Sequence, residues 1–264
     1  MPHLFVFGLG YSAGRLAARL AEAGWTVEGT GRAGAIRFED EAAVREAIGR
    51  ATHILSSVPP GDEGDPVLTR YGPALATAPA DWIGYLSATG VYGDTGGAWV
   101  DESAPVGGGR RSARVMADAA WQALGRPVHL FRLPGIYGPG RSVLERIRDG
   151  RARRIALPGQ VFSRVHVDDI VGGVIAGLRG PAGIYNLADD LPCPQNEVIA
   201  YGCALLGLPV PPVQTLAEAG LSPAAAAFYA ENRRVANGKA KRLLGWRLRY
   251  PDYRAGLGGM AAQL

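Results

Sequence analysis

Short apolar runs alternate along most of this chain with segments of helical periodicity. The strand-like runs occur at residues 4–7, 25–30, 52–58, 82–87, 128–132 and 183–187. Between them, apolar residues recur at helical spacing at residues 11–23, 40–49, 65–76 and 110–124. Because this alternation is typical of a parallel sheet with helices on both faces, it predicts an α/β fold with a doubly wound parallel sheet.

The alternation loosens after residue 140. We expect a helix over 142–149, a strand over 163–167, and a helix over 170–178 that Asp168 caps. Residues 190–264 are rich in Pro, Ala and Gly and predict short helices. The chain is therefore expected to form a sheet domain and, over the carboxyl edge of the sheet, a small C-terminal lobe. The predicted bounds are 1–140 plus 163–189 for the sheet domain, and 141–162 plus 190–264 for the lobe.

The loop between the first strand and the first helix is rich in glycine. In Rossmann-type sites the first glycine allows a tight turn and the second lets a pyrophosphate approach the backbone, while a third small residue packs helix on strand. The helix N-terminus then faces the phosphate charge. The loop here predicts a Rossmann-type dinucleotide site formed by Gly8, Gly10, Tyr11, Ser12 and Ala13.

The end of the second strand bears on the choice of cofactor. NAD enzymes usually place an acid there to bind the ribose hydroxyls, but Gly31 occupies that position and Arg32 follows it. Glu28 lies three residues earlier, inside the strand, where it should not reach the ribose. Because a guanidinium binds a 2′-phosphate through charge-assisted hydrogen bonds, Arg32 favours NADP over NAD.

The same loop also matches a second motif. Residues 10–14 have the G-x-S-x-G spacing of a hydrolase nucleophile elbow, with Ser12 as the nucleophile. In that fold the serine follows a late strand, whereas one strand alone precedes Ser12 here. A serine hydrolase is therefore a minor alternative.

Four later segments carry further motifs, namely YLSATGVYG at 85–93, RLPGIYGPGR at 132–141, RVHVDDI at 164–170 and YNL at 185–187. Together they resemble the extended short-chain dehydrogenase/reductases, in particular the NAD-dependent epimerase/dehydratase-like family. The tail, with RVAN at 234–237 and LGW at 244–246, is similar to an atypical bacterial subgroup. The resemblance covers nearly the whole chain. It implies a Rossmann sheet with a small substrate lobe, and a cofactor lined by Ser57, Val58, Pro59, Ser87, Arg114 and Pro134.

The chain departs from this family at the catalytic residues. Members use a serine, a tyrosine, and a lysine four residues after the tyrosine, and these positions fall on Ala88, Arg110 and Arg114. The two lysines of the chain, Lys239 and Lys241, lie near the C-terminus instead. Because arginine stays protonated at any working pH, Arg110 is excluded as a general acid or base.

Two functional hypotheses follow. In the first, the chain is a reductase or epimerase with relocated proton chemistry, for which Tyr137, His166 and Thr89 are the candidates and Tyr92 is less favoured. In the second, the chain binds NADP without turnover, as a sensor or a partner-binding protein. For His166, a structural role in the turn before a helix is favoured over catalysis.

Arginine dominates the charge, and the formal net charge is +4. Arg141, Arg164, Arg233 and Arg234 lie in segments that should meet between the sheet edge and the lobe. They are candidates to bind an anionic small-molecule substrate, or to pair with Asp and Glu across the lobe interface. The basic run at 146–154 lacks the continuous stripe and the aromatic residues of a nucleic-acid binder, so no nucleic-acid partner is expected.

Other features bear on location and chemistry. There is no apolar run long enough to span a bilayer and no signal-peptide pattern, so we expect a cytoplasmic protein without a membrane partner. Cys193 and Cys203 are too few for a disulfide framework. The four histidines form no metal-ligand spacing with them, so no metal is expected. Substrate identity and a homodimer are left open.

Overall fold

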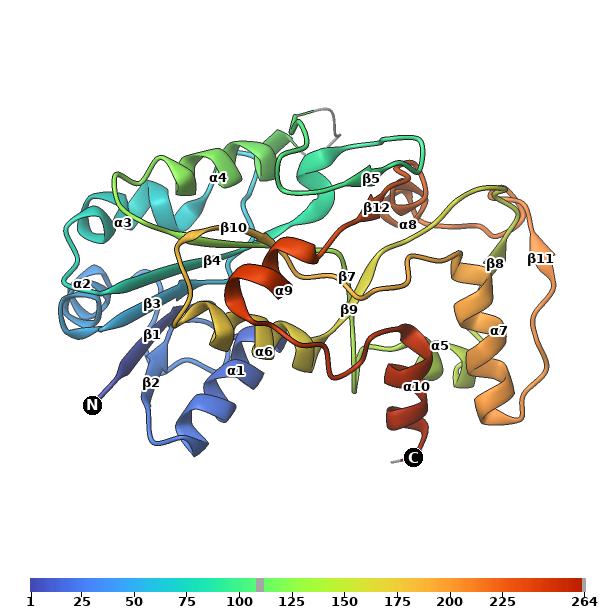
Figure 1. Cartoon of the computed structure of the whole chain (residues 1–264), viewed down its shortest axis with the longest axis horizontal. Coiled ribbons are helices and arrows are strands. Elements are labelled where there is room, and N and C mark those ends of the chain that lie inside the picture. Colours follow the sequence, from blue (N-terminus) through green and yellow to red (C-terminus); the bar gives the residue numbers. More distant parts are fainter. Residues whose placement is uncertain (108–111, 263–264) are drawn as a thin grey trace.

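A computed structural model describes residues 1–107 and 112–262 and contains a six-stranded parallel sheet (Figure 1). The strand order is β10-β6-β4-β3-β1-β2, and every neighbouring pair is parallel. The strands are β1 (His3–Phe7), β2 (Thr26–Gly29), β3 (His53–Ser56), β4 (Trp82–Ala88), β6 (His129–Leu133) and β10 (Gly183–Asn186). The predicted α/β class and Rossmann-type sheet are confirmed.

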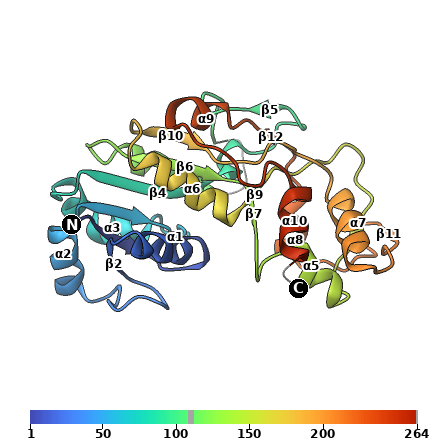
Figure 2. The same cartoon turned by 60° about the horizontal axis from the view of Figure 1, so that its bottom comes forward.

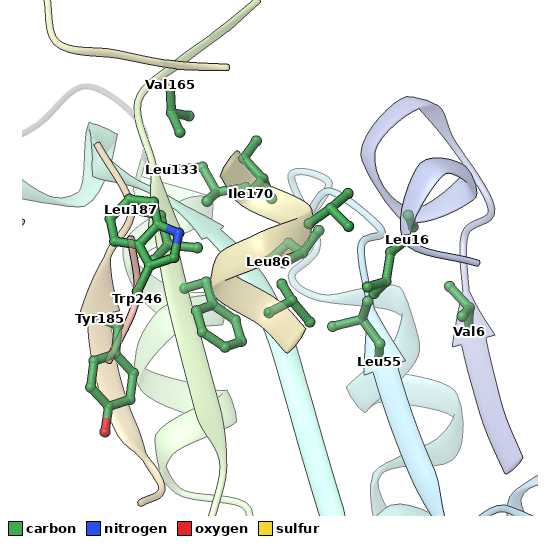
Figure 3. Packing of buried hydrophobic residues seen from close by; sticks show 14 of the residues in the cluster. Val6, Leu16, Leu55, Leu86, Leu133, Val165, Ile170, Tyr185, Leu187 and Trp246 are labelled. Carbon is green, nitrogen blue, oxygen red and sulfur yellow. The ribbon is translucent and has the colours of Figure 1, made fainter. Parts of the chain in front are cut away.

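Helices cover both faces of this sheet because its strands are apolar on both sides. In β1, Leu4 and Val6 point to one face and Phe5 and Phe7 to the other. The first face packs against α1 (Tyr11–Glu22) and α6 (Val167–Gly177), as Figure 3 shows for Leu16 and Ile170. The second face packs against α2 (Glu41–Arg50), α3 (Pro66–Ala76) and α4 (Ser112–Gln122). These helices begin and end within a few residues of the predicted bounds.

The order of the strands fixes where a ligand can bind. The chain starts at β1, runs to β2 on one side, and then crosses to β3 on the other side of β1. In open α/β sheets the crevice for ligands lies beyond the carboxyl ends of the strands at such a reversal. The glycine loop after β1 is at this point.

A separate cluster of helices forms the core of the C-terminal lobe. The helices α5 (Val143–Arg148), α7 (Gln195–Leu206) and α10 (Tyr253–Ala261) share one apolar core, and Figures 1 and 2 show them together at one end of the molecule. The lobe also contains the short parallel pair β8 (Arg154–Ile155) and β11 (Val213–Gln214), and the helix α8 (Pro223–Phe228).

Short pairs that the sequence did not predict connect the lobe to the sheet. Strand β7 (Gly135–Tyr137) pairs with β9 (Arg164–His166), and β5 (Trp99–Val100) pairs with β12 (Arg234–Val235). The short helix η1 (Thr89–Tyr92) follows β4, and α9 (Gly238–Leu244) packs on α6. As a result, segments far apart in the sequence meet beyond the carboxyl edge of the sheet.

The predicted cap of α6 is wrong. The helix begins at Val167, and the Nδ1 atom of His166 accepts the backbone N–H of Asp168 at 3.1 Å. Asp168 is therefore inside the first turn, where its carboxylate lies 3.5 Å from the guanidinium of Arg15. The structural role favoured for His166 is found, with His166 itself as the capping residue. Among the described residues, no helix is long and apolar enough to cross a membrane.

Candidate functional site

A cavity of about 500 Å³ lies at the carboxyl edge of the sheet, in front of α1. It brings together side chains from the loops after β1, β3, β4 and β6. Of the residues predicted to bind the cofactor, it is lined by Gly10, Tyr11, Ser12, Ser57, Pro59, Ser87, Arg114 and Pro134. The remaining four, Gly8, Ala13, Arg32 and Val58, do not line it.

The glycine loop has the backbone that this cavity requires. Gly8 has φ +84°, and a Cβ there would lie 3.0 Å from Val58 Cγ2, so the turn after β1 requires glycine. Ser57 supports the turn by donating its hydroxyl proton to the Gly8 carbonyl at 2.5 Å. A Cβ at Gly10 would have no atom nearer than the Gly8 carbonyl oxygen at 4.0 Å. The open side of the loop is thus at Gly10, where a phosphate would approach.

The end of β2 lies directly against this loop. Gly31 has φ +103°, and a Cβ there would lie 3.0 Å from the backbone nitrogen of Leu9, so no acidic side chain fits. Glu28 points elsewhere, because it accepts two hydrogen bonds from Arg50 at 3.0 and 2.7 Å. Arg32 follows Gly31 on the exposed loop. Arg32 does not line the cavity, and its contact with a ribose phosphate stays a prediction.

A buried polar network supports the floor of the cavity. Ser87 donates its hydroxyl proton to Asp118 Oδ2 at 2.7 Å, and Arg132 forms two hydrogen bonds to the same carboxylate at 3.1 and 2.7 Å. Arg132 also donates to the Tyr92 hydroxyl at 3.0 Å, and Tyr92 donates to Asn186 Oδ1 at 2.8 Å. Because the proton of Ser87 is engaged by Asp118, the lone pairs of Ser87 face the cavity as acceptors.

A second cavity, of about 460 Å³, adjoins the first. Six residues line both cavities, namely Gly135, Ile136, Arg141, Phe162, Ser163 and Phe228. The second cavity extends into the lobe between α5, α7, α8 and α10. A ligand in it would therefore reach a cofactor in the first cavity.

Ser163 lies at this junction. Its hydroxyl is placed to donate a hydrogen bond, whereas that of Ser87 is placed to accept one. The Oγ of Ser163 accepts the backbone N–H of Val235 at 2.9 Å, and the residue is buried. No described residue accepts a hydrogen bond from it, so its own proton is the one that can face the cavities. Ser163 is thus a hydrogen-bond donor where the two cavities meet.

The structure places the candidates for proton transfer in different surroundings. Thr89 lines the first cavity. Tyr137 lines the second, with its hydroxyl donating to the Asp252 carbonyl at 3.3 Å, and burial raises its pKa well above the usual range. His166 lines neither cavity, and burial lowers its pKa to about 4, which leaves a neutral ring. Tyr92 is buried, and this burial raises its pKa. A catalytic role for any of them stays a prediction.

The four candidate arginines divide between the two cavities: Arg141 and Arg233 line the first, Arg141 and Arg164 line the second, and Arg234 lines neither. Arg164 is buried and donates to the Phe162 carbonyl at 2.8 Å and to Gln195 Oε1 at 2.9 Å. Arg233 pairs with Glu231 at 2.8 Å, and Arg234 binds the carbonyl of Gly97. Arg141 differs, because it is exposed, lines both cavities and lies over the ring of Tyr11. Of these three, Arg233 alone pairs with a carboxylate of the described residues, whereas Arg164 and Arg234 are held by carbonyl oxygens and by Gln195.

The residues at the family's catalytic positions cannot carry out the family's proton transfer. Ala88 and Arg114 line the first cavity, as the alignment requires, but neither titrates near neutral pH. Arg110 lies outside the described residues. Ser12 also lines the first cavity, and no histidine hydrogen-bonds to it in the described parts of the chain. The nucleophile-elbow alternative thus gains no base from the structure.

Sequence reasoning missed several residues of the site. Asp118 and Arg132 are separated by 14 residues and pair only because α4 packs beside β6. Ser163, Phe162 and Phe228 carry no motif of their own. Of these residues, only Arg132 could have been recognised from the sequence. It is a charged residue within an apolar strand, and a buried charge requires an ionic partner.

Solved structures of other proteins share the fold of this chain. No family model matches the chain. A functionally unknown conserved protein from Silicibacter pomeroyi is 43% identical, with a TM-score of 0.90, and the match covers 100% of this chain and 99% of that one. Human epimerase family protein SDR39U1, solved with NADPH, is 20% identical with a TM-score of 0.81, and the match covers 99% of this chain and 100% of that one.

A curated relative, 3-diazoavenalumate denitrifying reductase from Streptomyces sp, is 32% identical over 144 residues, which are 49% of this chain and 45% of the relative. The chain spans about half the length of the curated relatives it matches. By its full-length similarity, the chain belongs to the same family as the Silicibacter pomeroyi protein. Its fold is that of the atypical, epimerase/dehydratase-like short-chain dehydrogenase/reductases, which confirms the resemblance drawn from the motifs.

Proposed function

We propose that this chain binds NADP(H) in the first cavity and uses it to reduce a small molecule held in the second. The observation that carries the proposal is the junction of the two cavities, which share six lining residues. The glycine loop opens into the first cavity and the lobe encloses the second. A nicotinamide in the first cavity supplies or accepts hydride when bound.

The choice of NADP rests on the end of β2. An acid that binds the ribose hydroxyls is sterically excluded at Gly31, and Glu28 is engaged by Arg50. Arg32 remains as the group that would bind a 2′-phosphate. The NADPH in the human structure supports the same choice.

The proton chemistry differs from that of the short-chain dehydrogenases. Neither Ala88 nor Arg114 can move a proton at neutral pH, whereas Ser163 presents a hydrogen-bond donor at the junction. We infer that Ser163 stabilises charge that develops on the substrate, and that the proton itself comes from water. The name of the Streptomyces relative, a reductase, supports reduction over epimerisation.

The second candidate is a protein that binds NADP without turnover. It is favoured by one observation, namely that Ala88 and Arg114 stand where the family has its serine and lysine. In this case the protein would bind the cofactor in one cavity and a second ligand in the other, and would act as a sensor.

The deciding experiment measures binding and hydride transfer separately. Calorimetric titration with NADPH and NADH is expected to show tight binding of NADPH in the native protein, and none in Gly10→Val. Oxidation of NADPH is then followed with a broad panel of carbonyl and other reducible compounds, in native protein, Ser163→Ala, Tyr137→Phe and His166→Asn. Turnover lost in Ser163→Ala alone supports the proposal. Tight NADPH binding without turnover on any compound supports the sensor, and no binding of either dinucleotide contradicts both.

A further inference from the structure

The second cavity contains hydrogen-bond donors that the protein itself does not use. Arg146 and Tyr229 line it, and neither side chain has a hydrogen bond or an ion pair with any residue in 1–107 or 112–262. The two lie close enough that Arg146 opposes the rise in the pKa of the Tyr229 hydroxyl that burial causes. A guanidinium and a phenol directed at the same space can bind one anionic group.

The other charges around this cavity are already matched. Arg151 donates to Asp149 at 3.1 Å, and Arg164 is held by carbonyls and by Gln195. Glu145 is the one carboxylate among the described lining residues, and it accepts the backbone N–H groups of Gly140 at 3.1 Å and Ser142 at 2.7 Å. The unmatched charge is therefore positive and is located at Arg146, with Arg141 at the boundary to the first cavity.

The wall beside these donors is aromatic. The rings of Phe162 and Phe228 are stacked face to face, with centroids 4.6 Å apart and planes 4° from parallel. Tyr229 packs edge-on against Phe162 at 5.6 Å. Phe162 is buried, whereas Phe228 keeps 46% of its surface exposed and lines both cavities. An exposed phenyl face beside a cavity offers a stacking surface to a flat ligand.

We propose that the second cavity selects a planar aromatic carboxylate, with its ring on Phe228 and its carboxylate between Arg146 and Tyr229. This inference rests on the proposed function, since it takes the second cavity as the substrate site. A single carboxylate matches Arg146, which among the described arginines that line this cavity alone is the one whose side chain has no hydrogen bond or ion pair within the described residues. Arg141 faces the glycine loop as well, and a cofactor phosphate there would compete for it. The end of the ligand remote from the carboxylate would lie at Ser163.

The test uses matched ligands on the full-length protein saturated with NADP⁺. Binding of 4-hydroxycinnamate, its carboxamide, 3-cyclohexylpropanoate and inorganic phosphate is measured by ligand-detected NMR. We expect the aromatic acid to bind at least tenfold more tightly than its amide, and more tightly than the cyclohexyl acid. Arg146→Gln should abolish the preference for the acid. Phe228→Leu should abolish the preference for the aromatic ring.

The control is Arg148→Gln, which removes an exposed arginine from the same helix that does not line the cavity. The proposal is overturned if none of the acids binds, if the amide binds as tightly as the acid, if phosphate displaces the aromatic acid at lower concentration, or if Arg146→Gln and Arg148→Gln behave alike. A parallel titration with NADPH distinguishes failure of this inference from failure of the proposed function. Loss of NADPH binding with retained binding of the acid to the protein without NADP⁺ would contradict the proposed function alone.

Discussion

The hydroxyl of Ser87 donates its proton to Asp118 at 2.7 Å, and the same carboxylate carries both hydrogen bonds from Arg132. Both charged groups are buried, with 1% of Asp118 and 2% of Arg132 exposed. Helix α4 is thus joined to β6 by this ion pair and to β4 by the Ser87 hydrogen bond, beside the first cavity that Ser87 lines. The serine is fixed as an acceptor by a residue that lines neither cavity.

Removal of the Asp118 charge should destabilise the whole sheet domain. Asp118→Asn leaves the Arg132 guanidinium buried without a counter-charge, which costs about 3–5 kcal/mol. Ser87→Ala removes one hydrogen bond and should cost about 1 kcal/mol. Urea unfolding of both variants measures the difference, with Asp62→Asn on an exposed loop as control. If both variants lose the same free energy of unfolding, the ion pair between Asp118 and Arg132 is not the main source of this stability.

Cofactor preference should depend on Arg32. A charge-assisted contact with the 2′-phosphate contributes about 1.5–3 kcal/mol, so Arg32→Ala should weaken NADPH binding by roughly ten- to a hundredfold and leave NADH unchanged. Arg37→Ala, in the same exposed loop, is the control. If native protein binds NADPH and NADH equally, the assignment of NADP is wrong.

The two loop glycines should respond differently to substitution. Gly10→Val adds a side chain on the open side of the loop, so dinucleotide binding should be lost while the melting temperature stays nearly native. Gly8→Ala forces a Cβ into a residue with φ +84° and toward Val58, so it should lose both binding and stability. Thermal unfolding with and without NADPH distinguishes these outcomes. Native affinity in Gly10→Val would remove the cofactor site from this loop.

Stability should decline in acid because of His166. Its folded pKa of about 4 lies below the unfolded value of about 6.5, chiefly through burial. The unfolded chain therefore takes up a proton between these values while the folded chain does not. Stability falls as pH decreases from about 6.5 to about 4, by up to about 3 kcal/mol.

His166→Asn retains a capping side chain without a titrating ring and isolates this contribution. The difference in unfolding free energy between native protein and variant, followed by chemical denaturation from pH 8 to pH 4, should favour the native protein less as the pH falls. A difference that is constant with pH would mean that the buried ring does not control the acid response. Asp169, whose pKa burial raises to about 6, contributes with the opposite sign in both proteins and cancels.

The native protein should lack the standard short-chain dehydrogenase reaction. A guanidinium titrates far above neutral pH, so Arg110 stays in one protonation state. In Arg110→Tyr with Arg114→Lys, a tyrosine regains a lysine four residues later in the sequence, and weak reduction of a generic ketone by NADPH is expected. Arg110→Lys with Arg114→Lys is the matched control without the phenol. Rapid native turnover of a ketone that disappears in Arg110→Ala would refute the prediction.

The sheet was predictable because its signals are local. Each strand is a short apolar run and each covering helix has its own periodicity, so β1, α1 and the glycine loop follow from residues that are neighbours in sequence. The cap of α6 was mistaken because His166 and Asp168 can both accept a backbone N–H, and only the true start of the helix decides between them. Spacing cannot resolve a shift of two residues.

The second cavity was not predictable for a different reason. The polarity of Ser163 depends on a backbone N–H that lies 72 residues away, at Val235. The wall depends on Phe162 and Phe228, which meet only after β9 and α8 are in place. The partners of the candidate arginines were hidden in the same way, because Arg164 is engaged by Gln195, whose position the sequence does not reveal. Long-range packing, and not residue type, decides which polar groups stay available.

Gly31 closes the usual mutational route to an acid after the second strand. Many dinucleotide enzymes can exchange one cofactor for the other by a point mutation that places an acid after the second strand. In this chain the same mutation would clash with the backbone of Leu9 and strain a left-handed residue, so folding would suffer before any new preference could be selected. Arg32→Ala could remove a preference for NADP, but an acid that binds the ribose hydroxyls could be gained at position 31 only after the loop is rebuilt.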